Sequence, residues 1–194
     1  MTDDDISSLQ HDRVVTLRSK RLLLRPLTTN DVGKHYVAWL NDPRVNRYLE
    51  TRHDAQTLES VRAYVEAQSA AQNSVLFGII LADNERHIGN IKLGPIHDHQ
   101  QVADVSLFIG DVDCWGRGYA TEAISQVVDY AFRNRGLIKL SAGAYVENAG
   151  SIAVFQKVGF QLEGLLRRHY MLKGKPSDVV MMGLCQDDLR PALE

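Results

Sequence analysis

Cysteine is scarce in this sequence, and neither sign of charge is in excess. The 194 residues include two cysteines, Cys114 and Cys185. A disulfide framework needs more cysteines in a shorter chain, so two thiols suit a reducing compartment. The 22 Lys and Arg residues nearly balance the 24 Asp and Glu residues, and the formal net charge is −2. This balance lacks the basic stripe typical of proteins that bind duplex nucleic acid, so we expect no nucleic-acid partner.

Long apolar runs are also missing. The longest one, Val75 to Ala82, is interrupted by Gly78 and is far shorter than the ~20 residues of a membrane span. The first residues, Met1 to Asp5, are acidic and lack the basic and apolar regions of a signal peptide. Hydrophobic residues make up 44% of the chain and charged residues 24%, which is typical of a globular protein. We therefore expect a cytoplasmic globular protein with no membrane partner.

The length predicts one domain. Residues 1–13 are polar and aperiodic, which indicates a flexible tail, and residues 14–188 form the predicted domain. Turn signals at 82–85 and at Gly94-Pro95 separate three middle strands, and Lys173 to Pro176 joins the last two. The patterns predict helices ending near Leu40, over 57–71, from Gly118 to Gly136 and over 151–158, with strands over 14–27, 75–81, 87–96, 102–109, 138–146, 160–172 and 178–184. We expect an α/β (α+β) fold with helices packed on one mixed sheet.

The most informative segment is a glycine loop, Trp115-Gly-Arg-Gly118, between a predicted strand and a strongly amphipathic helix. Glycines let the backbone approach a ligand closely, and the N-terminus of the helix adds partial positive charge. Arg117 adds a full charge within the loop. This order of residues predicts that the loop binds a phosphate or diphosphate. A tight turn without a ligand remains the alternative.

Two common phosphate-binding patterns do not fit this loop. The Lys-Ser/Thr pair of a Walker motif is absent. Only two of the three glycines of a dinucleotide-binding motif are present, and no acidic residue lies in Ile138 to Ala144, where a ribose ligand is expected. The loop also follows an antiparallel meander, whereas a dinucleotide fold opens with parallel units.

The segment Trp115-Gly-Arg-Gly-Tyr-Ala-Thr-Glu-Ala123 resembles the pyrophosphate-binding motif of the GNAT superfamily of acetyl-CoA-dependent N-acetyltransferases. Asn148 with Ser151 and Lys157-Val-Gly-Phe160 follow in the family's order. Arg21-Leu-Leu-Leu-Arg-Pro26 and Asn41-Asp-Pro43 resemble its Rim-type branch, which includes ribosomal-protein N-terminal acetyltransferases. The resemblance covers about Thr16 to Leu184. It implies the GNAT fold: a mixed, mostly antiparallel sheet of about seven strands, helices on both faces, and a splayed parallel strand pair that binds acetyl-CoA.

The resemblance also implies which residues bind acetyl-CoA. The pantetheine arm would lie between the strands around Leu107 and Ala142, and an N–H near Phe108 or Ile109 would polarise the thioester carbonyl. Asn148 would hydrogen-bond the pantetheine, with Phe155 packed near it. The pyrophosphate would be held by Gly116, Arg117, Gly118, Tyr119, Ala120 and Thr121.

Transfer to an amine needs a base, because alkyl amines are mostly protonated at neutral pH. Asp104 is the first candidate, since Ala103 to Leu107 matches the family segment in which some members carry a catalytic carboxylate. A carboxylate that merely flanks a strand is the alternative role for Asp104. His97 and His99 in the preceding loop are alternative bases. The short His97-Asp98-His99 run lacks the ligand spacing of a closed site, so we expect no metal.

The leaving thiolate needs an acid. Many relatives use a tyrosine where this chain has Phe155. Ser151 matches a serine to which Rim-type enzymes are proposed to give this role, although a serine at the start of a helix is also an ordinary N-cap.

The acceptor is the least determined element. The segments Ile88 to Ile96 and Lys139 to Tyr145 resemble Rim-type members associated with surface-polysaccharide synthesis, which suggests an amino-sugar nucleotide. The alternatives are an N-terminal acetyltransferase for a protein and a CoA-binding module without catalysis. Dimers are common among relatives, so a homodimer is possible.

Overall fold

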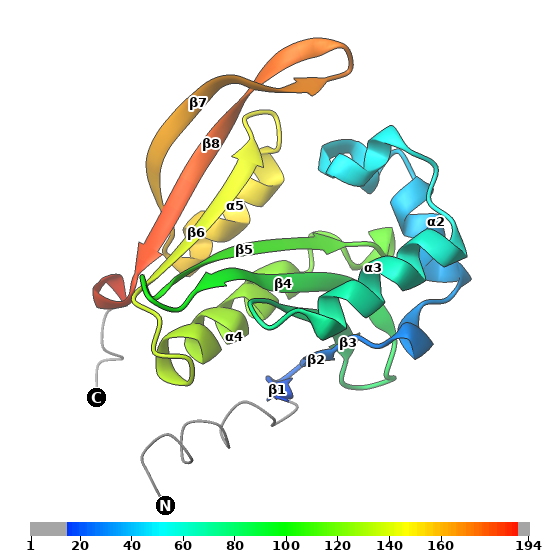
Figure 1. The fold of residues 1–194 in the computed structure, drawn as a ribbon, viewed down its shortest axis with the longest axis horizontal. Helices are drawn as coiled ribbons and strands as arrows, with labels where there is room; N and C mark the ends of the chain where they lie inside the picture. The colour runs from blue at the N-terminus through cyan, green and yellow to red at the C-terminus, as the bar shows by residue number, and fades with distance from the viewer. Residues whose placement is uncertain (1–14, 190–194) are drawn as a thin grey trace, which may run out of the picture.

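The computed structural model describes residues 15–189. The predicted tail, residues 1–13, lies outside these residues, as does Val14. One sheet of eight strands runs through the molecule in the order β1-β2-β3-β4-β5-β6-β8-β7 (Figure 1). The strands are β1 (Leu17–Arg18), β2 (Leu22–Pro26), β3 (Val75–Leu81), β4 (His87–His97), β5 (Val102–Ile109), β6 (Lys139–Tyr145), β7 (Gln161–Leu172) and β8 (Lys175–Cys185).

Four α-helices and five 3₁₀ turns connect these strands in the described part of the chain. The helices are α2 (Lys34–Asn41), α3 (Leu58–Ala70), α4 (Tyr119–Arg133) and α5 (Ala149–Val158). The 3₁₀ turns are η1 (Thr29–Asp31), η2 (Asn46–Tyr48), η3 (Glu50–His53), η4 (Val112–Cys114) and η5 (Gln186–Asp188).

Pairing in the sheet is antiparallel except between β5 and β6. This confirms the predicted mixed, mostly antiparallel sheet with one parallel pair. The eighth strand arises because the predicted first strand is two strands: the chain turns between Arg18 and Leu22, where the Ser19 N–H donates to the Leu22 carbonyl at 3.0 Å.

One predicted turn is wrong, and another is two residues shorter than predicted. Gly94-Pro95 lies inside β4, where the register with β5 shifts between Leu93 and Ile96. A bulge tolerates a proline because it removes one residue from regular ladder pairing. The chain turns instead after His97, where the Gln100 N–H donates to the His97 carbonyl. At the other hairpin, Lys175 and Pro176 already pair with β7, so the turn contains only Lys173 and Gly174.

Helices cover both faces of the sheet, as predicted (Figure 1). The apolar side of α4 packs against one face, together with Phe155 of α5. A second apolar cluster joins α2 and α3 to the opposite face, through Tyr36, Val61 and Val65. The α4 residues buried in the first cluster are Ala123, Ile124, Val127, Val128, Tyr130, Ala131 and Phe132.

Alternation along β5 and β6 decides which side chains reach which face. Ala103 and Val105 of β5 and Leu140 and Ala142 of β6 belong to the α4 cluster. Asp104 therefore points to the opposite face of the sheet, which α2 and α3 cover only in part.

Candidate active site

The parallel strands β5 and β6 separate soon after they meet. Their pairing covers three positions, and Asp104 opposite Ser141 is the last of them. Beyond it, β5 stays paired with β4 as far as Ile109, while β6 stays paired with β8 as far as Tyr145. Figure 1 shows β6 rising away from β5. A gap with free strand edges therefore opens at Asp104.

Backbone polar groups of β5 face this gap. The Gly110 N–H donates to the Ile88 carbonyl at 2.8 Å, and Phe108, two residues earlier, lies opposite Asn90 in β4. Hydrogen bonding in an antiparallel pair alternates, so the N–H and C=O of Phe108 face β4 while those of Leu107 and Ile109 face away from it. The Ile109 carbonyl accepts from Trp115 Nε1 at 2.8 Å. The Ile109 N–H and the N–H and C=O of Leu107 therefore remain to face the gap.

The glycine loop lies between β5 and α4, next to this gap. Gly116 and Gly118 have φ angles of 71° and 80°, in the left-handed region that favours glycine. A Cβ on Gly116 would meet no atom within 4 Å, so the space beside it is open. Gly118 is the N-cap of α4, and the first N–H groups of a helix have no partner within the helix. The loop and the first turn of α4 thus offer a set of N–H donors to an anion.

Arg21, in the bend directly before β2, contacts this loop from the neighbouring hairpin. Its Nη1 donates to the Arg117 carbonyl at 2.9 Å, and its Nε donates to Glu122 Oε2 at 2.7 Å. In the sequence, Arg21 is recognisable only as part of the segment Arg21 to Pro26, and no pattern there gives it a role. Its contacts lie 96 and 101 residues away, beyond the reach of any sequence pattern.

Asp104 is exposed on the sheet face opposite α4. Neighbouring atoms still remove part of the water around its carboxyl, which raises its pKa above the ordinary 3.8, and the charges of His97 and Lys92 oppose this rise only in part. His97, the last residue of β4, therefore lies near Asp104, and His99 is exposed in the turn that follows. A carboxylate with a raised pKa is a better proton acceptor than an ordinary one.

The start of α5 borders β6 at the open end of the gap. The Asn148 side chain accepts from the Ser151 N–H at 3.3 Å, so Asn148 is the N-cap and Ser151 lies inside the first turn. The alternative role of Ser151 as an N-cap is therefore wrong. Phe155 is 2% exposed, and its ring meets the Phe160 ring edge-on at 5.0 Å between centroids. Phe155 is therefore a core residue, and it has no hydroxyl that could protonate the thiolate.

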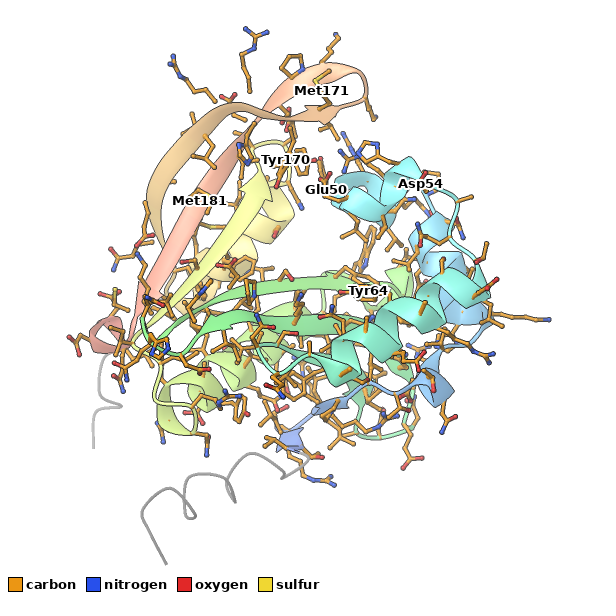
Figure 2. All side chains as sticks on the ribbon, in the orientation of Figure 1. Glu50, Asp54, Tyr64, Tyr170, Met171 and Met181 are labelled. Carbon is orange, nitrogen blue, oxygen red and sulfur yellow. The ribbon has the colours of Figure 1, made fainter. Side chains whose placement is uncertain are left out.

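The other border of the open end is made by η3 and the β7–β8 hairpin. Arg52 Nη2 donates to the Tyr145 hydroxyl and to the Met171 carbonyl, both at 2.8 Å. The Tyr145 hydroxyl in turn donates to Glu50 Oε1 at 2.5 Å. In Figure 2, Glu50 lies near Tyr170, and Met171 lies further along the β7–β8 hairpin. Sequence reasoning missed these residues, because no local pattern joins positions about a hundred residues apart.

A depression of about 730 Å³ lies on the hairpin beside this border. Its lining includes the arginines Arg167 and Arg168 and the carboxylate Asp178, which accepts from the Arg168 N–H at 2.7 Å. The next residue after the lining, Tyr170, stacks on Tyr145 with 5.5 Å between ring centroids. The depression therefore adjoins the open end of β6.

Two further findings concern the described residues. Across 15–189, no three or more His, Cys, Asp and Glu side chains are grouped so that they could hold a metal ion. Within the same range, no helix has the length and apolar character needed to cross a membrane.

Comparison with known proteins agrees with this geometry. The profile of the acetyltransferase (GNAT) domain family matches residues 21–161. The uncharacterized N-acetyltransferase YoaA of Bacillus subtilis (strain 168) is 30% identical over 164 residues, covering 84% of this chain and 92% of that protein. The alpha/beta-tubulin-N-acetyltransferase 9 of Homo sapiens is 27% identical over 160 residues, covering 75% of this chain and 74% of that protein.

The fold also matches solved structures. The spermidine N-acetyltransferase from Vibrio cholerae in complex with CoA and spermine superposes with a TM-score of 0.78 at 22% identity, covering 88% of this chain and 98% of that one. At this identity the likeness shows the fold alone.

Proposed function

This chain belongs to the GNAT family of acetyltransferases, whose profile spans residues 21–161, and from that premise we propose that it transfers an acetyl group from acetyl-CoA to a primary amine by direct attack in a ternary complex. One observation carries the proposal. The gap between β5 and β6 begins at Asp104, and the glycine loop stands at the end of β5, so a carboxylate and an anion site border the same gap. We further place the chain in the Rim-type branch, on the segments Arg21 to Pro26 and Asn41 to Pro43.

In this proposal the glycine loop and the first turn of α4 bind the diphosphate of acetyl-CoA. The N–H groups of a left-handed glycine pair and of a helix start can converge on one anion. The open space beside Gly116 lets a phosphate oxygen approach the backbone, and Arg117 adds positive charge. The residues assigned to this site are Gly116, Arg117, Gly118, Tyr119, Ala120 and Thr121.

The pantetheine arm would lie along the free edge of β5. Its amides can pair with the N–H and C=O of Leu107 as an added strand would, and Asn148 at the start of α5 borders the arm from the β6 side. The Ile109 N–H faces the gap, whereas the Phe108 N–H faces β4. We therefore assign the polarisation of the thioester carbonyl to Ile109. Phe155 supports this wall from within the core.

Acetyl-CoA supplies an activated acetyl group as a thioester, and the chain must hold the amine neutral beside it. We assign the base to Asp104, at the point where the gap begins. Its raised pKa favours proton uptake, and its short side chain favours a relay through water. For the thiolate we assign proton donation to Ser151, which is half-buried in the first turn of α5.

The acceptor that we propose is an amino sugar carried on a nucleotide. The depression lined by Arg167 and Arg168 supports this class, because guanidinium groups recognise phosphate by charge and paired hydrogen bonds. Its position beside the open end of β6 lets an acceptor span from the arginines toward the gap.

A panel of amines tests this function by release of free CoA thiol from acetyl-CoA. The panel contains a nucleoside-diphosphate amino sugar, spermidine, and peptides with free N-termini. We expect the amino-sugar nucleotide to give the highest kcat/KM. Thiol release with peptides alone would support protein N-terminal acetylation and would refute the sugar acceptor.

The same panel separates an enzyme from a binding module. Calorimetry first measures the affinity of the purified chain for acetyl-CoA. Binding without thiol release from any amine would favour a CoA-binding module. The absence of any binding would refute the whole proposal.

A further inference from the structure

The peptide bond between Arg117 and Gly118 is fixed from outside the glycine loop. Residues Trp115 to Gly118 are exposed, and the Arg117 carbonyl accepts from Arg21 Nη1 at 2.9 Å. Glycines have more backbone freedom than other residues, so a loop that contains two of them needs an external contact to hold one conformation.

Arg21 is itself held in place by several contacts. Its Nε donates to Glu122 Oε2 at 2.7 Å, and its backbone N–H donates to Oε1 of the same carboxylate at 3.1 Å. Its guanidinium lies 4.6 Å from the centroid of the Tyr119 ring. Ser19 Oγ donates to Glu122 at 2.6 Å. Burial alone would raise the pKa of Glu122, but these hydrogen bonds outweigh it and lower that pKa, which keeps the carboxylate charged.

The geometry of a trans peptide links this contact to the anion site. The C=O of one residue and the N–H of the next point in opposite directions across the peptide plane. Because the Arg117 carbonyl points at Arg21, the Gly118 N–H points away from Arg21. Without Arg21, the same peptide could turn its carbonyl oxygen toward the anion, where it would repel a phosphate.

We propose that Arg21 is a positioning residue for the diphosphate of acetyl-CoA. It fixes the Arg117–Gly118 peptide with its N–H toward the diphosphate, and it does this through the carbonyl of Arg117 rather than by touching the cosubstrate. This inference rests on the proposed function of the loop. It predicts that Arg21 lowers the Kd for CoA by preorganising the loop.

Three variants test the inference. Arg21→Gln removes the contact. Arg21→Lys keeps the charge, but a single ammonium cannot reproduce the fork that joins Glu122 to the Arg117 carbonyl. Arg18→Gln is the matched control, since Arg18 is an exposed arginine of β1 in the same hairpin.

Two ligands distinguish positioning from general loosening. Calorimetry gives the Kd for CoA, and an NMR titration gives the Kd for S-acetylpantetheine, which has the thioester arm but no diphosphate. We expect both Arg21 variants to raise the Kd for CoA by about tenfold or more. This is the change expected from the loss of one charge-assisted hydrogen bond. Both should bind S-acetylpantetheine as the wild type does, and Arg18→Gln should match the wild type with both ligands.

Each other outcome has a definite meaning. If the wild type binds CoA and both Arg21 variants bind it equally well, the positioning role is refuted while the proposed function stands. If an Arg21 variant loses affinity for both ligands, its effect is general and the inference is refuted as well. If the wild type binds no CoA, it is the proposed function that fails. Thermal unfolding by circular dichroism verifies that each variant is folded. If Arg21→Gln does not fold, the binding data of Arg21→Lys alone decide whether the inference holds.

Discussion

Gly116 and Gly136 form a matched pair in which strain is equal and only the surroundings differ. Their φ angles are 71° and 65°, and a Cβ on either would meet no atom within 4 Å. Gly116 precedes α4 in the glycine loop, and Gly136 follows the same helix at its other end. Alanine at either position therefore costs the same left-handed backbone strain, about 1–2 kcal/mol.

The expected loss of stability follows from this strain. In a domain of this size, 1 kcal/mol lowers Tm by roughly 2–4 °C, so both Gly116→Ala and Gly136→Ala should lower Tm by roughly 2–8 °C. Scanning calorimetry measures both. Because neither new methyl group meets a neighbour, the two losses should be nearly equal.

Affinity for CoA should separate the two variants. A Cβ on Gly116 would occupy the open space that the diphosphate is proposed to use, and the loss of one charge-assisted hydrogen bond costs about 1.5–3 kcal/mol. This corresponds to a Kd for CoA raised about 10- to 150-fold in Gly116→Ala. Gly136→Ala should bind CoA as the wild type does. The reasoning would be refuted if Gly116→Ala lost stability as Gly136→Ala does and still bound CoA with unchanged affinity.

Two further predictions concern single carboxylates. Asp104→Asn should lower kcat on the order of 100-fold with an unchanged Kd for CoA. In the wild type, kcat should fall as the pH falls through the raised pKa of Asp104; the same acid limb in a pH profile of the Asn variant would remove Asp104 from the base role. Asp31 is predicted to affect stability and not catalysis. Burial would raise its pKa, but hydrogen bonds from Arg25 and Thr28 outweigh burial and lower the pKa to about 2. A lowered pKa adds stability that is fully present above pH 3.8 and is lost as the pH falls through about 2. Asp31→Asn should therefore lower the free energy of unfolding by about 2 kcal/mol at pH 7, a figure that allows for solvent around Arg25. Urea titrations should give unfolding free energies of the two proteins that converge near pH 2. A difference that stays constant at all pH values would contradict this origin.

Local patterns were sufficient for most elements and for the glycine loop that we propose binds a diphosphate. The 3.6-residue period places α4, whose predicted apolar side is the side that is buried, and the apolar runs between turn signals place most of the strands. The two glycines before α4 adopt the left-handed conformation that glycine favours, and this preference is readable from the residue type alone. Where local signals failed, a tertiary contact had overridden them. At Gly94-Pro95, for example, β4 continues because Ile96 and His97 pair with Ala103 and Val102, and the Ile96 N–H also donates to the Asn73 carbonyl at 2.7 Å.

The sequence by itself determined most elements and the glycine loop, since these depend on residues close together in the chain. Through the family resemblance it also implied the GNAT fold and the candidate carboxylate Asp104. Only the tertiary structure decided where β5 and β6 separate, which backbone groups of β5 face the gap, and that Arg21 reaches the Arg117 carbonyl. The physical reason is distance along the chain. Strand register and side-chain contacts between residues about a hundred positions apart depend on how the whole sheet and its helices pack, and no short segment carries that information.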